Sequence, residues 1–590
     1  MAIAAIRRKN QVKGGEIITR ILAAEGVDTV FGIVDGTYFG LYSTFGDHGI
    51  RLVTPRHETS AAHAAGAYAR LTGKLGVCMA SNGPGVANVL PGVAVEQVEG
   101  NRVLLLTSCR RTGLMGPDRG GAYQHFDQVA VTAPMTKWSV AVSEVGRLAE
   151  VIRRALRLCW TGRPGVVHVD VPEDIMNGAY ELNDGWFQAL PAYRTTEPLT
   201  PAPAQVAAAV RLLAEAKRVV IHAGSGVVHA KAYAELKRVA ELLEAPVTTS
   251  WGARCAVDER DRHAVPMVHI DTVNRARTEA DLVLCLGSRL GETDWWGKAP
   301  YWGTPATQKM IQVNIDADAL GNTRPADLLV QADAKVFLGQ LARALEGRAG
   351  NLKPRRTWLN ALKAHQQKHR AKLDEHLADR GVPMNSAHVA ATCQRLLPED
   401  TVTVFDGGNT AVWGNFYHQG RTPGCLLGTA KMGMLGAGVS QAIGAAVARP
   451  GQPVVCIIGD GAMGFHQQEV ETAVRNGLQI LYLVLCDKQW GMVKMTQQFA
   501  LKPLKTLVMK SLGPDETINA DLSETRFDDL GRAMGAHGER VGDPAGLEGA
   551  IRRSLATGRT AVIHVDVNPV KHMWAPGLRH FKAMHAEPGA

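Results

Sequence analysis

The sequence contains no hydrophobic run of the ~18 to 20 residues that a membrane-spanning helix needs. Its first 15 residues also lack the apolar core and the cleavage site of a secretory signal peptide. We therefore expect a cytoplasmic protein that does not enter a membrane.

Paired cysteines and clustered basic residues are also missing. The nine cysteines occur singly, without a Cys-x-x-Cys pair of the kind found at zinc and redox sites. We expect most of them to be small buried hydrophobic residues. The formal charge is +9, but the basic residues are dispersed rather than gathered into a stripe that could follow phosphates. Nucleic-acid binding is therefore not expected.

What the sequence does contain is a repeated alternation of short apolar runs and amphipathic helical patterns. This alternation is typical of parallel sheets with crossover helices. A length of 590 residues allows three or four domains of ~150 residues each. The predicted fold class is α/β, with three doubly wound parallel-sheet domains.

Composition shifts place the predicted boundaries. A segment rich in Pro and Thr, residues 188–205, reads as a linker, and a charged segment, residues 345–380, reads as exposed connecting helices. The predicted parts are an N-terminal domain (1–186), a central domain (187–350), connecting helices (351–384), a C-terminal domain (385–568) and a tail (569–590).

The segment 453–493 carries the strongest signal for chemistry. One apolar run ends at Gly459, followed by Asp460, Gly461 and a predicted helix of about a dozen residues, and a second apolar run ends before Asp487. Both acids are therefore expected at the carboxyl ends of parallel strands, where open α/β sheets bind ligands. Two carboxylates there suit Mg²⁺, which takes one or two carboxylates together with phosphate oxygens. Taken alone, however, Gly-Asp-Gly is equally a common turn whose Asp caps a helix.

This segment resembles the diphosphate- and magnesium-binding motif of thiamine-diphosphate enzymes. The resemblance rests on Gly-Asp-Gly, on the 27 positions from Asp460 to Asp487, and on Gly491-Met492-Val493. The family usually has an Asn pair where this chain has Cys486-Asp487, which keeps an oxygen ligand and adds negative charge. The resemblance implies three metal ligands and three cofactor contacts in this segment: the metal ligands Asp460, Asp487 and the backbone oxygen of Gln489, and the cofactor contacts Gly461, Ala462 and Met492.

Further motifs extend the resemblance to the acetolactate-synthase-like members of the family, of the large catalytic subunit type. VFDGGNTAVW is similar to the family's diphosphate-contacting turn, and LLGTAKMGMLGAGVSQAIGAAVA to the segment that holds the cofactor's V shape. The implied roles are a carbonyl for the aminopyrimidine at Gly433 and an apolar wedge between the two cofactor rings at Leu435. The implied diphosphate contacts are Gly407, Gly408, Asn409 and Thr410.

The N-terminal block resembles the family's pyrimidine-binding domain. Residues 52–93 are similar to its Arg-His-Glu sequence, small-residue helix and Gly-Pro-Gly loop, which implies that Glu58 hydrogen-bonds N1′ of the aminopyrimidine. Without the resemblance, Glu58 would be read as a solvated helix cap. The segment after Tyr123 is similar to a substrate-side stretch of acetolactate synthases and implies a catalytic role for Gln124. The three domains then correspond to pyrimidine-binding, central and diphosphate-binding domains.

The function implied is decarboxylation of a 2-oxo acid such as pyruvate, dependent on thiamine diphosphate and Mg²⁺, with carboligation to a second carbonyl. The His-His pair of pyruvate-decarboxylase relatives does not occur in the sequence, but residues 33–38 depart from the acetolactate synthase pattern. An alternative therefore stays open: a lyase similar to 2-hydroxyacyl-CoA lyase or oxalyl-CoA decarboxylase. In that case the basic tail around Lys571, Arg579 and Lys582 would help to hold an acyl-CoA.

Two further expectations concern partners and cofactors. The resemblance implies a homodimer or homotetramer with active sites at the interface between subunits. Some acetolactate synthases bind a flavin in the central domain, and the short Gly-x-Gly at His222–Gly226 is a weak indication of bound FAD or ADP.

Overall fold

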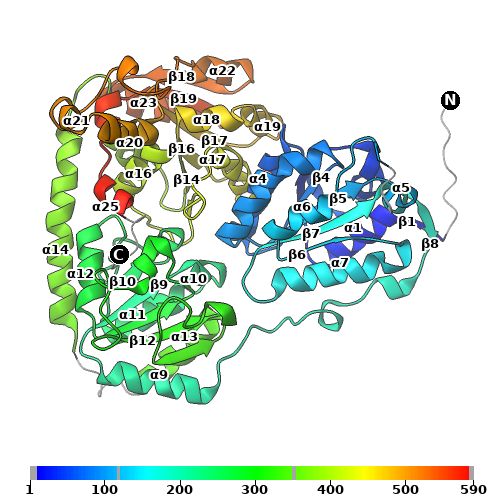
Figure 1. Cartoon of the computed structure of the whole chain (residues 1–590), viewed down its shortest axis with the longest axis horizontal. Helices are drawn as coiled ribbons and strands as arrows, with labels where there is room; N and C mark the ends of the chain where they lie inside the picture. The colour runs from blue at the N-terminus through cyan, green and yellow to red at the C-terminus, as the bar shows by residue number, and fades with distance from the viewer. Residues whose placement is uncertain (1–9, 116–119, 348–353, 584–590) are drawn as a thin grey trace. The chain divides into compact units, whose positions relative to one another are not determined.

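The computed structural model in Figure 1 describes residues 10–115, 120–347 and 354–583. The chain forms two compact units. The first consists of the residues up to Glu197 together with Ser440–Pro450, and the second of Pro198–Val439 and the residues from Gly451 onward. Among the described residues, no helix combines the length and the apolar character needed to cross a membrane.

The first unit is built on a six-stranded parallel sheet with the order β3-β2-β4-β5-β7-β6. Its four inner strands are fully buried, as expected for a sheet covered on both faces, and the edge strands β3 and β6 are partly exposed. The strands are β2 (Thr29–Gly32), β3 (Arg51–Val53), β4 (Gly76–Ala80), β5 (Val103–Cys109), β6 (Trp138–Ala141) and β7 (Val166–Pro172). A separate antiparallel pair joins β1 (Gln11–Lys13) to β8 (Ala179–Glu181).

Helices of the first unit pack in pairs, α1 against α7 and α3 against α4. The helix α7 shows why: Leu148, Ile152 and Leu156 recur at four-residue spacing and are fully buried, while the arginines between them reach outward. The helices are α1 (Gly14–Ala24), α2 (Phe39–Tyr42), α3 (Glu58–Thr72), α4 (Pro84–Glu99), α5 (Thr112–Met115), α6 (Gln128–Thr132), α7 (Val145–Trp160) and α8 (Glu173–Asn177).

The second unit contains two parallel sheets. The five-stranded sheet has the order β10-β9-β11-β12-β13. Its strands are β9 (Val219–Ala223), β10 (Val247–Thr249), β11 (Leu282–Leu286), β12 (Lys309–Asn314) and β13 (Leu328–Gln331). The accompanying helices are α9 (Pro203–Glu215), α10 (Ser225–His229), α11 (Tyr233–Leu243), α12 (Ile270–Glu279) and α13 (Ala334–Glu346).

The six-stranded sheet of the second unit has the order β15-β14-β16-β17-β19-β18. Its strands are β14 (Val402–Asp406), β15 (Leu426–Leu427), β16 (Val454–Gly459), β17 (Ile480–Cys486), β18 (His537–Val541) and β19 (Ala561–Asp566). The helices of this part are α14 (Arg356–Asp374), α15 (Ala387–Leu396), α16 (Gly408–Tyr417), α18 (Asp460–His466), α19 (Glu469–Arg475), α20 (Gly491–Leu501), α21 (Pro503–Met509), α22 (Phe527–Ala533), α23 (Pro544–Ala556), α24 (Pro569–Met573) and α25 (Leu578–Ala583). The helix α17 (Ala437–Ala448) is divided between the units, because its residues from Ser440 onward belong to the first.

The two six-stranded sheets share one topology. In each sheet, the strand that comes first in the sequence (β2 or β14) has the next strand (β3 or β15) on one side, where it forms the edge of the sheet. The strand after that (β4 or β16) lies on the other side. This reversal creates a switch point between β14 and β16, and parallel α/β sheets bind ligands at the carboxyl ends of the strands at such a point. The predicted fold class, three parallel-sheet α/β domains, is confirmed.

The two sheets of the second unit are joined through buried contacts. The Arg254 guanidinium is 5% exposed and pairs through two nitrogens with Glu259, each at 2.8 Å. The same side chain donates to Asn415 Oδ1 at 2.7 Å and to the His418 carbonyl. Asn415 belongs to α16, so this buried ion pair fixes the helix that begins at the switch point.

Two predicted helices differ from the structure. The segment 351–384 is not simply exposed, because α14 buries Leu359, Leu362 and Leu373 along one face. The helix of about a dozen residues expected after Gly461 is divided into α18 and α19. The backbone carbonyls of Gln467 and Gln468 accept hydrogen bonds from the N–H groups of Val470 and Glu471, three positions further along the chain. These hydrogen bonds form a tight turn between the two helices.

Candidate functional site

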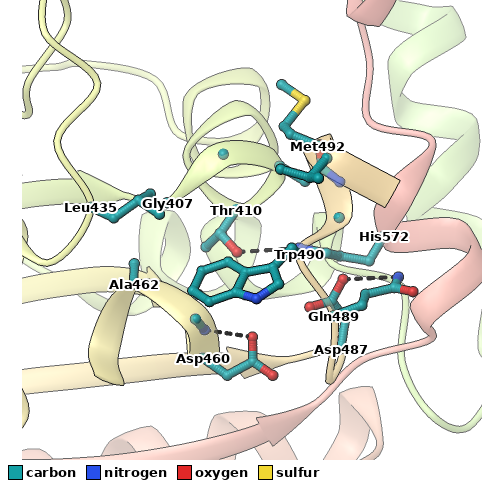
Figure 2. A pocket seen from close by; sticks show the side chains of 16 residues that line it. Gly407, Thr410, Leu435, Asp460, Ala462, Asp487, Gln489, Trp490, Met492 and His572 are labelled. Atoms are coloured by element: carbon teal, nitrogen blue, oxygen red, sulfur yellow. Dashed lines mark hydrogen bonds between the residues drawn. The ribbon is translucent and has the colours of Figure 1, made fainter. Parts of the chain in front are cut away.

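A cavity of about 120 Å³ lies at the switch point of the second unit (Figure 2). Three loops form it, each following one of three neighbouring strands: β14, β16 and β17. All three are connections from a strand to a helix, so helix N-termini and their N–H groups surround the cavity. The lining residues are Gly407, Gly408, Asn409, Thr410, Leu435, Gly459, Asp460, Gly461, Ala462, Asp487, Gln489, Trp490, Gly491, Met492, Val493 and His572.

Glycine is required at two points of this lining for different reasons. Gly407 has φ +91°, a left-handed conformation that side chains disfavour. Gly491 lies so close to its neighbours that an added Cβ would be 2.5 Å from Asn409 Nδ2 and 3.3 Å from Asp487 Oδ2. The backbone therefore approaches the cavity more closely than any other residue would allow.

Two carboxylates at the cavity come from successive strand ends. Asp460 accepts hydrogen bonds from its neighbour Gly461 N and from Lys488 N, both at 2.8 Å. It therefore joins the loop after β16 to the loop after β17. Asp487 Oδ2 accepts from Gln489 Nε2 at 3.1 Å.

Burial changes the acidity of both groups. Burial, reinforced by the neighbouring Asp487 carboxylate, raises the pKa of Asp460 to about 7. Burial also raises the pKa of Asp487 to about 7. Two buried carboxylates whose charged forms are disfavoured by burial are a donor set that a divalent cation would stabilise, and hard oxygen ligands suit Mg²⁺.

The third predicted metal ligand lies on the same loop. Gln489 is 6% exposed, and its side-chain amide donates to the Pro569 carbonyl at 2.9 Å as well as to Asp487. A bridge to Asp521 uses the Lys488 carbonyl and the Trp490 N–H, and so it does not engage the Gln489 carbonyl. The backbone oxygen of Gln489 is therefore not used by this bridge, which is compatible with the metal-ligand role that the family resemblance implies.

Asn409 supplies an independent indication of a polar ligand. Its side chain is 4% exposed and lines the cavity, and neither the oxygen nor the nitrogen of the amide has a hydrogen-bond partner. A buried amide without partners costs free energy, and such groups in proteins are normally satisfied. A diphosphate, which accepts hydrogen bonds from N–H donors, fits this amide and the surrounding loops.

Of the two residues expected to hold the rings of the cofactor, Leu435 and Gly433, only Leu435 lines the cavity. Leu435 lines the cavity, as expected for a side chain that contacts the cofactor. Gly433 is not among the residues that line it; it has φ +63°, and its N–H donates to the Thr429 carbonyl at 2.8 Å.

The sequence analysis missed two large side chains of the cavity, Trp490 and His572. His572 lies in the tail, where the sequence shows no periodic pattern. Its ring nitrogens lie 2.6 Å from Ser386 Oγ and 3.2 Å from Thr410 Oγ1. Burial lowers the pKa of His572 to about 4, so the imidazole is neutral near pH 7. In the sequence His572 is a lone histidine, and nothing near it indicates that Thr410 and Ser386, 162 and 186 positions away, are its partners.

Glu58 and Gln124 belong to the first unit. Glu58 begins α3, is 8% exposed, and accepts a hydrogen bond from Asn88 Nδ2 at 3.1 Å. An added Cβ at Gly85 would be 3.3 Å from Glu58 Oε1, and one at Gly83 would be 2.7 Å from the Gln124 carbonyl. Glu58 and Gln124 therefore flank the same Gly-Pro-Gly turn, although the Gln124 side chain itself is exposed.

That turn is fixed by a buried network which the sequence did not reveal. Gly83 N donates to Gln128 Oε1 at 2.8 Å, and Gln128 Nε2 donates to Asp170 Oδ1 at 2.9 Å. Burial raises the pKa of Asp170 to about 6. The network connects the turn beside Glu58 to the central strands β5 and β7.

The fold is α/β, and the cavity has the position and the surrounding N–H groups of a phosphate-binding site in such folds. Three family models match the chain: the N-terminal TPP-binding domain of thiamine pyrophosphate enzymes at residues 12–131, the central domain at 206–341, and the C-terminal TPP-binding domain at 406–565. The chain therefore belongs to the thiamine pyrophosphate enzyme family and is an enzyme that depends on this cofactor.

Within the family, the chain is similar over nearly its whole length to acetolactate synthases. It is 29% identical to a probable acetolactate synthase large subunit of Methanocaldococcus jannaschii, over 96% of this chain and 94% of that protein. It is 28% identical to the acetolactate synthase isozyme 3 large subunit of Escherichia coli K12, over 96% and 97%. A probable acetolactate synthase of Mycobacterium bovis is 30% identical, over 94% and 96%.

Replacing Gly491 with alanine tests the close approach of the backbone to the cavity. The added methyl group would force Asn409 or Asp487 to move, and overpacking of this kind typically costs about 1 to 3 kcal/mol. We expect thiamine diphosphate to bind about 10-fold more weakly or worse, as measured by equilibrium dialysis. Gly464→Ala is the matched control, because a Cβ there meets nothing within 4 Å. Equal affinity in the two variants would contradict the described packing.

Proposed function

We propose that the protein is an acetolactate-synthase-like carboligase that requires thiamine diphosphate and Mg²⁺. It would act on pyruvate or a close 2-oxo acid. In the reaction with pyruvate, one molecule loses CO₂, and its remaining two-carbon unit forms a new carbon-carbon bond to the carbonyl of a second pyruvate. The product would be 2-acetolactate.

The observation that carries this proposal is the similarity to acetolactate synthases along the chain, in combination with the cavity of the second unit. Asp460, Asp487 and the Gln489 carbonyl would hold the metal ion, whose remaining positions would take diphosphate oxygens. The turn at Gly407–Thr410 and the loop residues Gly461, Ala462 and Met492 would surround the diphosphate. Leu435 would separate the two rings, and Gly433 would offer its carbonyl to the aminopyrimidine.

When bound, thiamine diphosphate supplies the nucleophilic carbon and the electron sink that decarboxylation of a 2-oxo acid requires. Glu58 would share a proton with N1′ of the aminopyrimidine, a task for which its buried position is suited. Gln124, which flanks the same Gly-Pro-Gly turn as Glu58, would contact the substrate. Carboligation also requires that the intermediate is not protonated early, and the sequence lacks the His-His pair that gives decarboxylase relatives their proton donors.

The acyl-CoA alternative gains no support. The relatives described above are acetolactate synthases. Of the three basic residues considered for the CoA, Lys571 pairs with Asp379 at 2.7 Å. The side chains of Arg579 and Lys582 lie outside the described residues.

We do not include a flavin in the proposal. The glycines of the His222–Gly226 turn are explained by chain packing, because an added Cβ at Gly224 or Gly226 would be 2.4 or 2.7 Å from the backbone of Gly287. His222 itself is fully buried and lies 3.3 Å from Asp294. The turn therefore gives no separate argument for a nucleotide.

The assembly we propose is a homodimer, or a homotetramer made of two such dimers, in which Glu58 of one subunit faces the cofactor cavity of its partner. This arrangement would bring together two groups of site residues that belong to different compact units of one chain.

Product analysis tests the proposed function. We expect the protein, supplied with thiamine diphosphate, Mg²⁺ and ¹³C-labelled pyruvate, to form 2-acetolactate in excess of acetaldehyde, as measured by NMR. Predominant acetaldehyde would overturn carboligation. Absence of pyruvate consumption, together with rapid cleavage of a 2-hydroxyacyl-CoA, would favour the lyase alternative.

A further inference from the structure

A short segment that the proposed function does not use, residues 517–524, lies along the loop that carries Asp487 and Gln489. We call it the strap. Trp490 N donates to the Ala520 carbonyl and Leu522 N donates to the Lys488 carbonyl, both at 2.8 Å. These two hydrogen bonds lie on either side of Gln489 and pair the strap with the loop that carries Asp487 and Gln489 in an antiparallel bridge. We call this second loop the metal loop.

Side chains fasten the strap to α20, the helix that begins directly after the metal loop. Lys494 Nζ lies 2.5 Å from Asp521 Oδ1, and the Lys494 side chain is only 5% exposed, whereas that of Asp521 is 33% exposed. One turn further along α20, the Gln497 amide accepts from Ile518 N at 2.7 Å and donates to the Ile518 carbonyl at 2.9 Å. A buried ammonium group needs a charged partner, so Lys494 strongly favours the position of the strap in which Asp521 meets it.

The metal loop contains a residue in an unfavourable backbone conformation, which the pairing with the strap would stabilise. Lys488, between Asp487 and Gln489, has φ +58°, a conformation that a residue with a side chain rarely adopts. The hydrogen bond from its N–H to Asp460 joins the two carboxylate loops, and its carbonyl is the acceptor for the strap. Strained backbone of this kind persists only where the surrounding structure determines it.

We propose that Lys494 and Asp521 are positioning residues: their ion pair holds the strap against the metal loop and so keeps the Asp487 carboxylate and the Gln489 carbonyl in metal-binding geometry. The inference rests on the proposed function, because it assumes a divalent ion at these ligands. Neither residue lines the cavity, so both would act through the loop rather than by contact with the cofactor. Partners that orient metal ligands typically change metal affinity 10- to 100-fold when they are removed.

The test uses the full-length protein, stripped of metal, and measures binding without substrate. Thiamine diphosphate binding is followed by calorimetry at increasing Mg²⁺, which gives the Mg²⁺ concentration for half-maximal binding. We expect Lys494→Met and Asp521→Asn each to raise this concentration about 10- to 100-fold. The double variant should be little worse than either one, because both changes break the same ion pair.

Lys505→Met is the matched control. Lys505 belongs to the neighbouring helix α21 and pairs with Glu516, a residue outside the strap, at 2.6 Å; the Lys505 side chain is 48% exposed. We expect its Mg²⁺ dependence to equal that of the wild type. Lys494→Arg, which keeps a cation opposite Asp521, should stay within a few-fold of the wild type.

The outcomes separate this inference from the proposed function. If the wild-type protein binds no thiamine diphosphate at any Mg²⁺ concentration, the proposed function is wrong. If the wild type shows Mg²⁺-dependent binding and Asp521→Asn has the same half-maximal concentration, the positioning role is wrong. A lower melting temperature of the metal-free variants with unchanged Mg²⁺ dependence would assign Lys494 and Asp521 to stability alone. Asp521 is partly exposed, so its variant supplies the answer even if Lys494→Met does not fold.

Discussion

Replacing Asp460 with alanine should abolish activity. The substitution removes a predicted metal ligand and also the acceptor of the Lys488 N–H, the hydrogen bond that joins the two carboxylate loops. We therefore expect the rate to fall by more than the ~10- to 100-fold typical of losing a partner that only orients a metal ligand. Steady-state turnover of pyruvate at saturating thiamine diphosphate and Mg²⁺ measures the effect.

Two control experiments make the result for Asp460→Ala interpretable. Asp515→Ala removes an exposed acid elsewhere in the same unit and should leave turnover unchanged. The Asp460→Ala protein should still melt cooperatively, because burial and Asp487 raise the pKa of Asp460 and make its charged form unfavourable in the metal-free protein. Retention of wild-type turnover by the folded variant would exclude Asp460 as a metal ligand.

Replacing Glu58 with glutamine should slow the reaction strongly while leaving cofactor uptake intact. The amide keeps the size of the side chain and can still contact Asn88, but it cannot share a proton with N1′ in the same way. General acid-base assistance of this kind is typically worth ~10² to 10⁴ in rate. The direct measurement is exchange of the C2 proton of the bound cofactor by NMR, which should slow together with turnover.

The matched control is Glu16→Gln, which alters another buried glutamate in the first turn of a helix of the same unit. It should leave C2 exchange unchanged. If Glu58 acts across a subunit interface, mixing Glu58→Gln chains with Asp460→Ala chains should restore up to about one active site in each heterodimer. No recovery in demonstrated heterodimers would mean that each site is built within one chain, and unchanged exchange in Glu58→Gln would exclude the proton-sharing role.

Local patterns in the sequence were sufficient to predict the three sheets and the position of two carboxylates. Apolar runs followed by Gly459-Asp460 and by Asp487 marked β16 and β17, and parallel strands bring such ends to one edge. Gly407 and Thr410 were expected there only from the family resemblance, and the structure places them in the lining of the same cavity as Asp460 and Asp487.

The side chains that the sequence did not predict depend on contacts between distant segments. His572 meets Ser386 and Thr410 across more than 160 positions, and Lys494 meets Asp521 through a loop without periodic pattern. A lone histidine or lysine has the same local sequence whether it is buried against a partner or exposed. The division of α18 from α19 escaped prediction for a different reason, because the tight turn at Gln467 and Gln468 contains neither proline nor glycine.

Calorimetric titration of the metal-free wild-type protein with thiamine diphosphate, in the presence and absence of Mg²⁺, tests the central claim most directly. If the cavity at Asp460 and Asp487 holds the diphosphate through a divalent ion, one cofactor should bind per chain with Mg²⁺ present, and affinity should fall sharply when EDTA replaces the metal. Equally tight binding with and without a divalent ion would contradict the account.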